Sequence, residues 1–128
     1  MLVKIHSAAV QGIEALPVTI EVHRQNGFQF RLVGLADAAV RESQQRIRAA
    51  LLNSGFRWPG FRITVNMAPA DLRKVGTSYD LPLAIGILAA TGQLNSDAYS
   101  QFLLAGELSL DGTIKPIKGA LPIALSQN

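Results

Sequence analysis

The sequence predicts an α/β fold in which strands alternate with helices. Apolar and polar residues alternate with a period of two over much of residues 1–35 and again over 61–67, as in strands with one buried face. Between these regions, and again after residue 80, the apolar residues take helical spacing or fill the whole segment. The 128 residues contain no linker, repeat or low-complexity tract, so we expect a single domain over residues 1–128.

Four strands are expected from runs of alternating apolar residues. Their inward-facing residues are Val3 and Ile5; Val18, Ile20 and Val22; Phe28, Phe30 and Leu32; and Phe61, Ile63, Val65 and Met67. The dipeptide Asn26-Gly27 separates the second run from the third, and both residues tolerate a positive φ. We therefore expect a two-residue hairpin that pairs the second strand with the third.

A first helix is expected to begin at Asp37, whose side chain can cap it, and to run to about Ser54, with Gly55 as its end. Its apolar stripe consists of Val40, Ile47 and Leu51. Glu42 and Arg46 are four residues apart, so we expect them to form an ion pair on the helix surface.

A second helix is expected over about residues 80–91, with Pro82 in its first turn. Because this segment is apolar nearly all round, it should be the buried centre of the fold. Residues 102–117 are typical of a hairpin around Asp111-Gly112. Residues 119–126 start like a helix just before the chain stops, so we expect a domain truncated at its C-terminal end.

The charge is unevenly distributed along the chain. The net charge is +3, but residues 41–74 alone carry +5, so the rest carries −2. The cations of this segment are Arg41, Arg46, Arg48, Arg57, Arg62, Arg73 and Lys74. Such a segment indicates either a surface for an anionic partner or an ordinary solvated face.

Several classes of site are excluded by composition and motif. The chain has no cysteine and only two histidines, so it offers no thiolate zinc site, and we expect no metal centre. No phosphate-binding P-loop and no G-x-S-x-G motif is present. No apolar run reaches the roughly 18 residues of a membrane span and no signal peptide is recognised, so we expect a cytoplasmic protein without a membrane partner.

The polar loop over residues 73–80 leads directly into the expected second helix. Backbone N–H groups at a helix start can bind an anion, and Arg73, Lys74 and the hydroxyls of Thr77 and Ser78 could add donors. The alternative is that Thr77, Ser78 or Asp80 simply caps the helix. Capping is the more frequent role of these residue types.

A set of motifs along the whole chain carries a family resemblance. They are residues 33–43 (VGLADAAVRES), 48–50 (RAA), 53–56 (NSGF), 62–72 (RITVNMAPADL), 78–86 (SYDLPLAIG) and 106–112 (GELSLDG). In these motifs the sequence resembles the ComM/YifB family of Mg-chelatase-like AAA+ proteins of bacteria. The resemblance implies a Lon-like (ChlI-type) N-terminal domain. Its fold would be that of ribosomal protein S5 domain 2 and the Lon protease C-terminal domain, with a mixed sheet packed against helices and a left-handed βαβ crossover.

The resemblance also implies a role within a larger protein. An AAA+ ATPase module, absent from these residues, would follow the domain, and the full protein would be a hexameric DNA translocase that drives branch migration in recombination during natural transformation. ATP and Mg²⁺ would be cofactors of that absent module, and we expect neither a cofactor nor an enzymatic activity for the chain itself. We expect the DNA to meet Arg41, Arg48, Arg62, Arg73 and Lys74.

The Lon likeness raises the question of a peptidase site. Lon-type peptidases place a serine nucleophile in a G-P-S-A-G loop and a lysine in a later G-G-x-K segment. The matching positions here hold Ser78 and Leu121, and leucine cannot activate a hydroxyl. We therefore expect a non-catalytic accessory domain, with two alternatives: a Ser-Lys peptidase using Ser78 with Lys115 or Lys118, or a protein-interaction platform without DNA contact.

Overall fold

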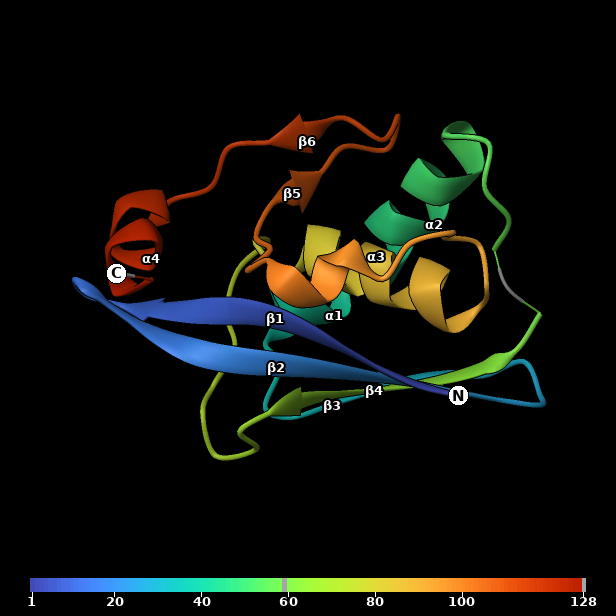
Figure 1. Ribbon diagram of the computed structural model, residues 1–128, viewed down its shortest axis with the longest axis horizontal. Coiled ribbons are helices and arrows are strands. Elements are labelled where there is room, and N and C mark those ends of the chain that lie inside the picture. The colour runs from blue at the N-terminus through green and yellow to red at the C-terminus, as the bar shows by residue number, and fades with distance from the viewer. Residues whose placement is uncertain (59, 128) are drawn as a thin grey trace.

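The computed structural model describes residues 1–58 and 60–127, in which a four-stranded sheet has helices packed over one of its faces (Figure 1). The strands of this sheet are β1 (Leu2–Gln11), β2 (Glu14–Gln25), β3 (Phe30–Val33) and β4 (Arg62–Ala68). The helices are α1 (Ala38–Arg41), α2 (Ser43–Asn53), α3 (Asp80–Ala90), the 3₁₀ helix η1 (Ala98–Gln101) and α4 (Ala120–Ser126). A separate ribbon consists of β5 (Glu107–Leu108) and β6 (Ile114–Lys115). The expected α/β class is confirmed.

The sheet is mixed, with the strand order β1-β2-β4-β3. β1 pairs antiparallel with β2, β2 pairs antiparallel with β4, and β4 pairs parallel with β3. The connection from β3 through α1 and α2 to β4 is therefore a βαβ unit between neighbouring parallel strands. The handedness of this crossover stays a prediction.

The hairpin expected at Asn26-Gly27 is wrong. Gly27 does have a positive φ of 134°, but β4 lies between the two strands that were expected to pair. β4 is a central strand with both of its edges paired, and its alternating residues Ile63, Val65 and Met67 are all buried. The hairpin of the sheet joins β1 to β2 instead, and Gly12 supplies the positive φ of 62° that its two-residue turn requires.

The first expected helix forms as two pieces, α1 and α2, separated by Glu42. Its start is confirmed, since an Asp37 side-chain oxygen accepts a hydrogen bond from the backbone N–H of Val40 at 2.8 Å. Its end is confirmed as well, because Ser54 is the C-cap and Gly55 follows with a φ of 87°. Because of this break, Arg41 on α1 is not part of the same continuous helix as the residues of α2.

The buried centre is α3, as expected, and it packs on β1 and β2. A Cβ at Gly86 would lie 2.6 Å from Cγ2 of Val22, so only glycine lets the helix approach the sheet this closely. Although α3 is strongly apolar, it has 11 residues, and no helix in the described chain has the length and apolarity to cross a membrane.

The C-terminal third of the chain matches its expectation in outline. The ribbon of β5 and β6 is antiparallel around a turn in which Gly112 has a φ of 91°, although each strand has only 2 residues. The terminal segment is helical, as expected, and α4 lies over the end of the β1–β2 hairpin (Figure 1). This arrangement encloses the space between the hairpin, the loop before α3 and the segment before α4.

Candidate functional site

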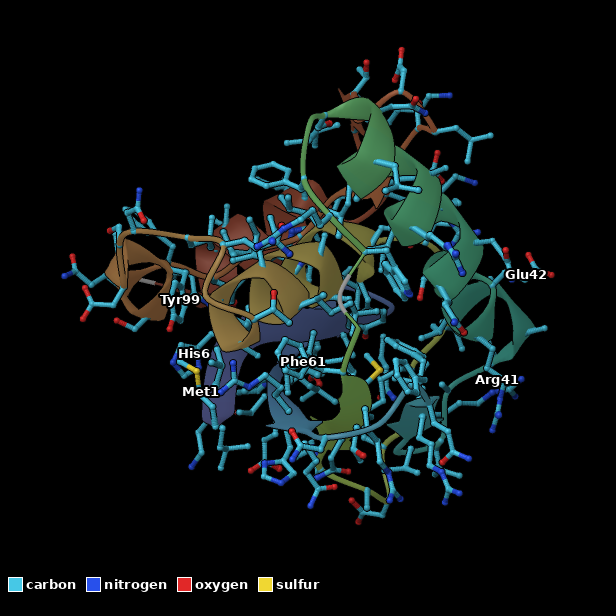
Figure 2. All side chains as sticks on the ribbon, turned by 90° about the vertical axis from the view of Figure 1, so that its right-hand side faces the viewer. Met1, His6, Arg41, Glu42, Phe61 and Tyr99 are labelled. Atoms are coloured by element: carbon cyan, nitrogen blue, oxygen red, sulfur yellow. The ribbon has the colours of Figure 1, made fainter. Side chains whose placement is uncertain are left out.

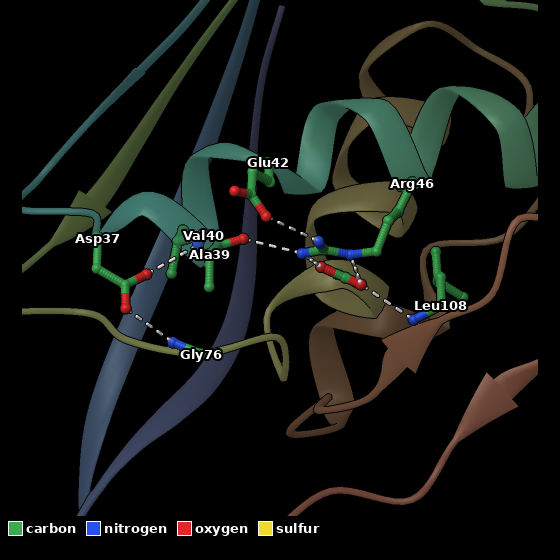
Figure 3. Close-up of polar contacts among 8 residues, drawn as sticks. Asp37, Ala39, Val40, Glu42, Arg46, Gly76 and Leu108 are labelled. Carbon is green, nitrogen blue, oxygen red and sulfur yellow. Dashed lines mark hydrogen bonds and ion pairs between the residues drawn. The ribbon is translucent and has the colours of Figure 1, made fainter.

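An ion pair between Arg46 and Asp80 joins the helices to the β5–β6 ribbon. Nε of Arg46 donates to Oδ2 of Asp80 at 2.7 Å, and Nη2 of Arg46 donates to Oδ1 at 2.9 Å (Figure 3). Nη2 also donates to the carbonyl of Ala39 at 2.9 Å, and the backbone N–H of Leu108 donates to Oδ2 of Asp80 at 3.1 Å. Asp80 is only 1% exposed, so the protein itself satisfies this carboxylate.

The expected pair of Glu42 with Arg46 is confirmed, but it is the weaker contact. Its oxygen lies 4.0 Å from Nη1 of Arg46, and the Glu42 side chain is 71% exposed. The hydrogen bonds to Asp80 are the main cause that raises the pKa of Arg46 above its ordinary value. The sequence did not indicate the Asp80 partner, because the two residues are 34 positions apart.

The start of α3 is not capped by a side chain. The N-cap residue is Tyr79, without a side-chain cap hydrogen bond, so the expectation that Thr77, Ser78 or Asp80 caps this helix is wrong. Asp80 is drawn to Arg46 instead, and the carbonyl of Ser78 accepts a hydrogen bond from Gly106 at 2.8 Å. Among the described residues, the hydroxyl of Ser78 makes no capping hydrogen bond at the helix start.

Lys74 is completely buried, with 0% exposure. Its ammonium donates to the carbonyls of Gly34 at 2.8 Å and Met67 at 2.6 Å, and also to the carbonyl of Pro69. Burial lowers the pKa of Lys74, while the charge of Asp71 acts in the opposite direction. We expected this cation to meet a phosphate, but protein carbonyls enclose it, so it does not belong to the exposed basic surface.

Gly34 makes the cluster around Lys74 possible. It has a φ of 113°, and a Cβ at this position would lie 2.3 Å from the carbonyl oxygen of Met67. Only glycine allows the ends of β3 and β4 to come close enough to present both carbonyls to one ammonium.

The structure places the other expected DNA-binding arginines in three regions. Arg41 is exposed at the end of α1 and points away from the core beside Glu42 (Figure 2), and its Nε donates to the carbonyl of Ala36 at 3.2 Å. Ala36 forms a bridge with Lys74, so the segment that carries Arg73 lies next to the start of α1. These contacts bring the neighbourhoods of Arg41 and Arg73 together.

Arg48 and Arg62 lie away from that contact. Arg48 is exposed on α2, with its guanidinium carbon 5.7 Å from the centre of the Trp58 ring. Arg62 is half-buried at the start of β4, and its Nε is buried without a hydrogen-bond partner among the described residues. Arg73 follows the opposite end of β4, so the structure does not place Arg62 beside Arg73.

The loop before α3 borders a cavity of about 820 Å³. Ser78 and Lys118 both line this cavity, together with Arg73. Leu121, at the position of the Lon lysine, lies on α4 and is 68% exposed. The structure therefore places Ser78 and one of the two lysines considered for a peptidase at the same cavity, while the described residues show no hydrogen bond between them.

The buried ion pair should contribute strongly to stability. Replacing Asp80 with alanine leaves the Arg46 guanidinium without its main partner and the Leu108 N–H without an acceptor. We expect D80A to lower the free energy of unfolding by about 3 kcal/mol, measured by urea denaturation. The matched control is E42A, which removes the exposed partner of the same arginine and should cost less than about 0.5 kcal/mol. Equal losses in the two variants would contradict the importance of the buried contact.

Tyr79 should make the stability depend on alkaline pH. Burial, together with the charge of Asp37, raises the pKa of Tyr79 from 10.0 to about 12. Above pH 10 the unfolded chain loses this proton while the folded chain keeps it, so stability should fall from pH 10 to about 12, by up to about 1.4 kcal/mol per pH unit. Y79F has no phenol to ionise and should lack this component in urea denaturation. Curves that run parallel over this range would disprove the assignment.

Comparison with known proteins agrees with the family motifs. Residues 20–128 match the family described as "Subunit ChlI of Mg-chelatase". The chain is 49% identical over 123 residues to "Competence protein ComM" of Haemophilus influenzae, which covers 95% of this chain and 24% of that protein. It is 43% identical over 121 residues to "Uncharacterized protein YifB" of Escherichia coli, covering 94% of this chain and 24% of that protein. The chain thus spans about a quarter of the length of these relatives, and it belongs to the Mg-chelatase ChlI family.

Proposed function

We propose that the chain is the non-catalytic N-terminal accessory domain of a Mg-chelatase-like AAA+ ATPase resembling ComM. Family membership supports an ATPase parent, and the matched relatives are about four times as long as the matched region. The parent would work in the cytoplasm as a hexameric ring and use ATP and Mg²⁺ for branch migration of DNA. The mixed sheet with parallel β3 and β4 supports the S5 domain 2-like fold, and the left-handed crossover is a further part of this proposal.

The contribution of this domain would be to bind the DNA backbone or to assist ring assembly. The observation that carries the DNA role is the exposure of Arg41, Arg48 and Arg73, of which two lie on chain segments that contact each other. Arginine suits phosphate, because its planar group donates two hydrogen bonds at once. Contacts of this kind hold the backbone and are independent of base sequence.

Arg62 and Lys74, the other two residues expected to contact DNA, contribute less to the proposed surface or not at all. Arg62 is half-buried beside Gly27, and a Cβ on that glycine would lie 3.1 Å from Cβ of Arg62. It can reach DNA only through the end of its guanidinium. Lys74 is left out, because its ammonium is enclosed. Three exposed arginines then predict about three phosphate contacts.

Charge reversal tests this surface. With about three phosphates contacted, the logarithm of DNA affinity should fall with the logarithm of salt concentration at a slope of about −3. In the full-length protein, the double variant R41E/R48E should lower the affinity for duplex DNA and flatten this slope toward about −1. Fluorescence anisotropy of a labelled duplex over a salt series measures both quantities.

A matched control separates the surface from net charge. Lys4 and Lys115 are exposed and lie on β1 and β6, outside the basic segment, so K4E/K115E changes the charge equally. K4E/K115E should leave the salt dependence of DNA affinity close to that of the unmodified full-length protein. Suppose that R41E/R48E folds and oligomerises normally and still binds DNA with an unchanged slope. This surface then does not contact DNA, and a protein-interaction platform without DNA contact is the better-supported function.

A second candidate is the Ser-Lys peptidase, favoured by one observation. Ser78 and Lys118 line the same cavity, as a serine nucleophile and its base would need to do. Against it stands the absence of a hydrogen bond between the two side chains in the described residues. Lys115 lies on β6, and the residues that line this cavity do not include it.

A serine-reactive probe decides between the two candidates. If the domain is non-catalytic, a fluorophosphonate should not label Ser78 in the intact protein, because no base activates its hydroxyl. Mass spectrometry of the treated protein, with S78A and K118Q alongside, measures the labelling. Stoichiometric labelling of Ser78 that disappears in K118Q would overturn the non-catalytic reading.

A further inference from the structure

Arginine and aromatic residues are concentrated in two segments of the chain. Residues 24–31 and 48–62 together contain five of its eight arginines, five of its eight aromatic residues, and no aspartate or glutamate. The arginines are Arg24, Arg31, Arg48, Arg57 and Arg62, and the aromatic residues are Phe28, Phe30, Phe56, Trp58 and Phe61. These ten residues are called the arginine–aromatic end below.

Strand pairing brings the two segments together at one end of the sheet. Gln25 at the end of β2 pairs with Arg62 at the start of β4, and β3, which begins at Phe30, pairs with the other edge of β4. The centres of the Phe30 and Trp58 rings are 6.1 Å apart. Figure 2 looks onto this end of the molecule, with Phe61 near the middle of the view. The arginines and the rings therefore belong to one region of the surface.

Two arginines of this end lie over aromatic rings. The guanidinium carbon of Arg24 is 4.7 Å from the centre of the Phe61 ring, and that of Arg48 is 5.7 Å from the centre of the Trp58 ring. Both side-chain ion pairs found among the described residues belong to Arg46, so no carboxylate there is paired with an arginine of this end. A cluster of cations without counter-ions of its own is suited to a polyanion.

The rings of this end are accessible from the solvent. The alternating pattern predicted that Phe28 faces inward, but this residue lies before the start of β3 and is 91% exposed. The other four aromatic residues of this end are half-buried, so none of them is enclosed in the core. An accessible flat ring can stack on a nucleic-acid base, and every base offers a face for this contact.

We propose that the arginine–aromatic end binds single-stranded DNA. The arginines would hold phosphates through their planar groups, while the exposed rings would stack on bases. The bases of a duplex are already stacked on one another, so these rings favour a single strand. An acidic protein segment would meet the arginines but would leave the rings without a partner.

The proposed site extends the DNA role to a second surface. It shares Arg48 with the duplex surface proposed above, but it does not depend on Arg41 or Arg73. The choice of DNA over RNA rests on the proposed function, whereas the preference for a single strand rests on the rings.

The fluorescence of Trp58 provides a direct test, because this residue is the only tryptophan of the 128-residue chain. An oligothymidylate of about ten nucleotides, added to the chain, should quench this fluorescence in a saturable way. A duplex of the same length and a glutamate peptide of the same length should both bind more weakly. If the three exposed arginines Arg31, Arg48 and Arg57 each meet a phosphate, the slope of log affinity against log salt should be about −2.

Variants of Phe28 separate stacking from general apolar contact. F28L keeps an apolar side chain but removes the flat ring, so it should weaken oligothymidylate binding about fivefold or more. F28Y keeps the ring and should retain the affinity of the unmodified chain. Because Phe28 is 91% exposed, neither variant should alter the fold, which circular dichroism checks.

Variants of the arginines test the charge. R31Q/R57Q removes two exposed cations of this end and should flatten the salt slope to about −0.7. The matched control is K115Q/K118Q, which removes two exposed cations outside this end and should leave both affinity and slope unchanged. R41Q should likewise leave oligothymidylate binding unchanged.

The outcomes distinguish this site from the duplex surface. The inference is wrong if the glutamate peptide binds as tightly as oligothymidylate, if F28L binds like F28Y, or if the lysine control loses as much affinity as R31Q/R57Q. Each of these results can occur while R41E/R48E still abolishes the duplex contact, so the duplex surface would stand. Conversely, quenching that responds to F28L and R31Q/R57Q would support this site even if R41E/R48E left duplex binding unchanged.

Discussion

The arrangement of the helices depends on a single buried contact, the ion pair of Arg46 with Asp80. One carboxylate that is 1% exposed holds a guanidinium from α2, starts α3 and accepts the backbone N–H of Leu108 in β5. Three elements that are far apart in sequence therefore meet at two oxygen atoms. The same guanidinium also reaches the carbonyl of Ala39 in α1, so the contact connects α2 to α1 across the break at Glu42.

Along the chain, the ion pair lies next to residues of both the proposed DNA surface and the cavity before α3, which share Arg73. Arg48, on the proposed DNA surface, is two positions after Arg46 on α2. Tyr79 and Glu107, in the cavity, directly precede Asp80 and Leu108. The buried pair thus holds in place the chain segments that carry Arg48, Tyr79 and Glu107. Placing donors on a rigid support is what an anion site requires, because donors that are already in place need no reorganisation on binding.

Local patterns in the sequence predicted most of the elements, and pairing between distant residues accounts for what they missed. The cap at Asp37, the glycine ends at Gly55 and Gly112 and the buried α3 follow from local chemistry, and they are confirmed. The order of the strands was not predictable from Asn26-Gly27, because a turn signal specifies a change of direction and not the neighbour. For the candidate site, the charge pattern predicted a basic surface, and Arg41, Arg48 and Arg73 are indeed exposed. The pattern could not distinguish an exposed cation from Lys74, which is surrounded by the carbonyls of three other residues.

The cluster around Lys74 constrains how the sequence can vary among related proteins. The carbonyls of Gly34 and Met67 reach the ammonium only because nothing larger than hydrogen stands on the Cα of Gly34. A side chain at position 34 would separate the two strand ends and leave the buried cation with fewer acceptors. A residue without a side-chain donor at position 74 would in turn leave these carbonyls unpaired. Positions 34 and 74 are therefore expected to change together in evolution, as a glycine and a lysine that are retained or replaced as a pair.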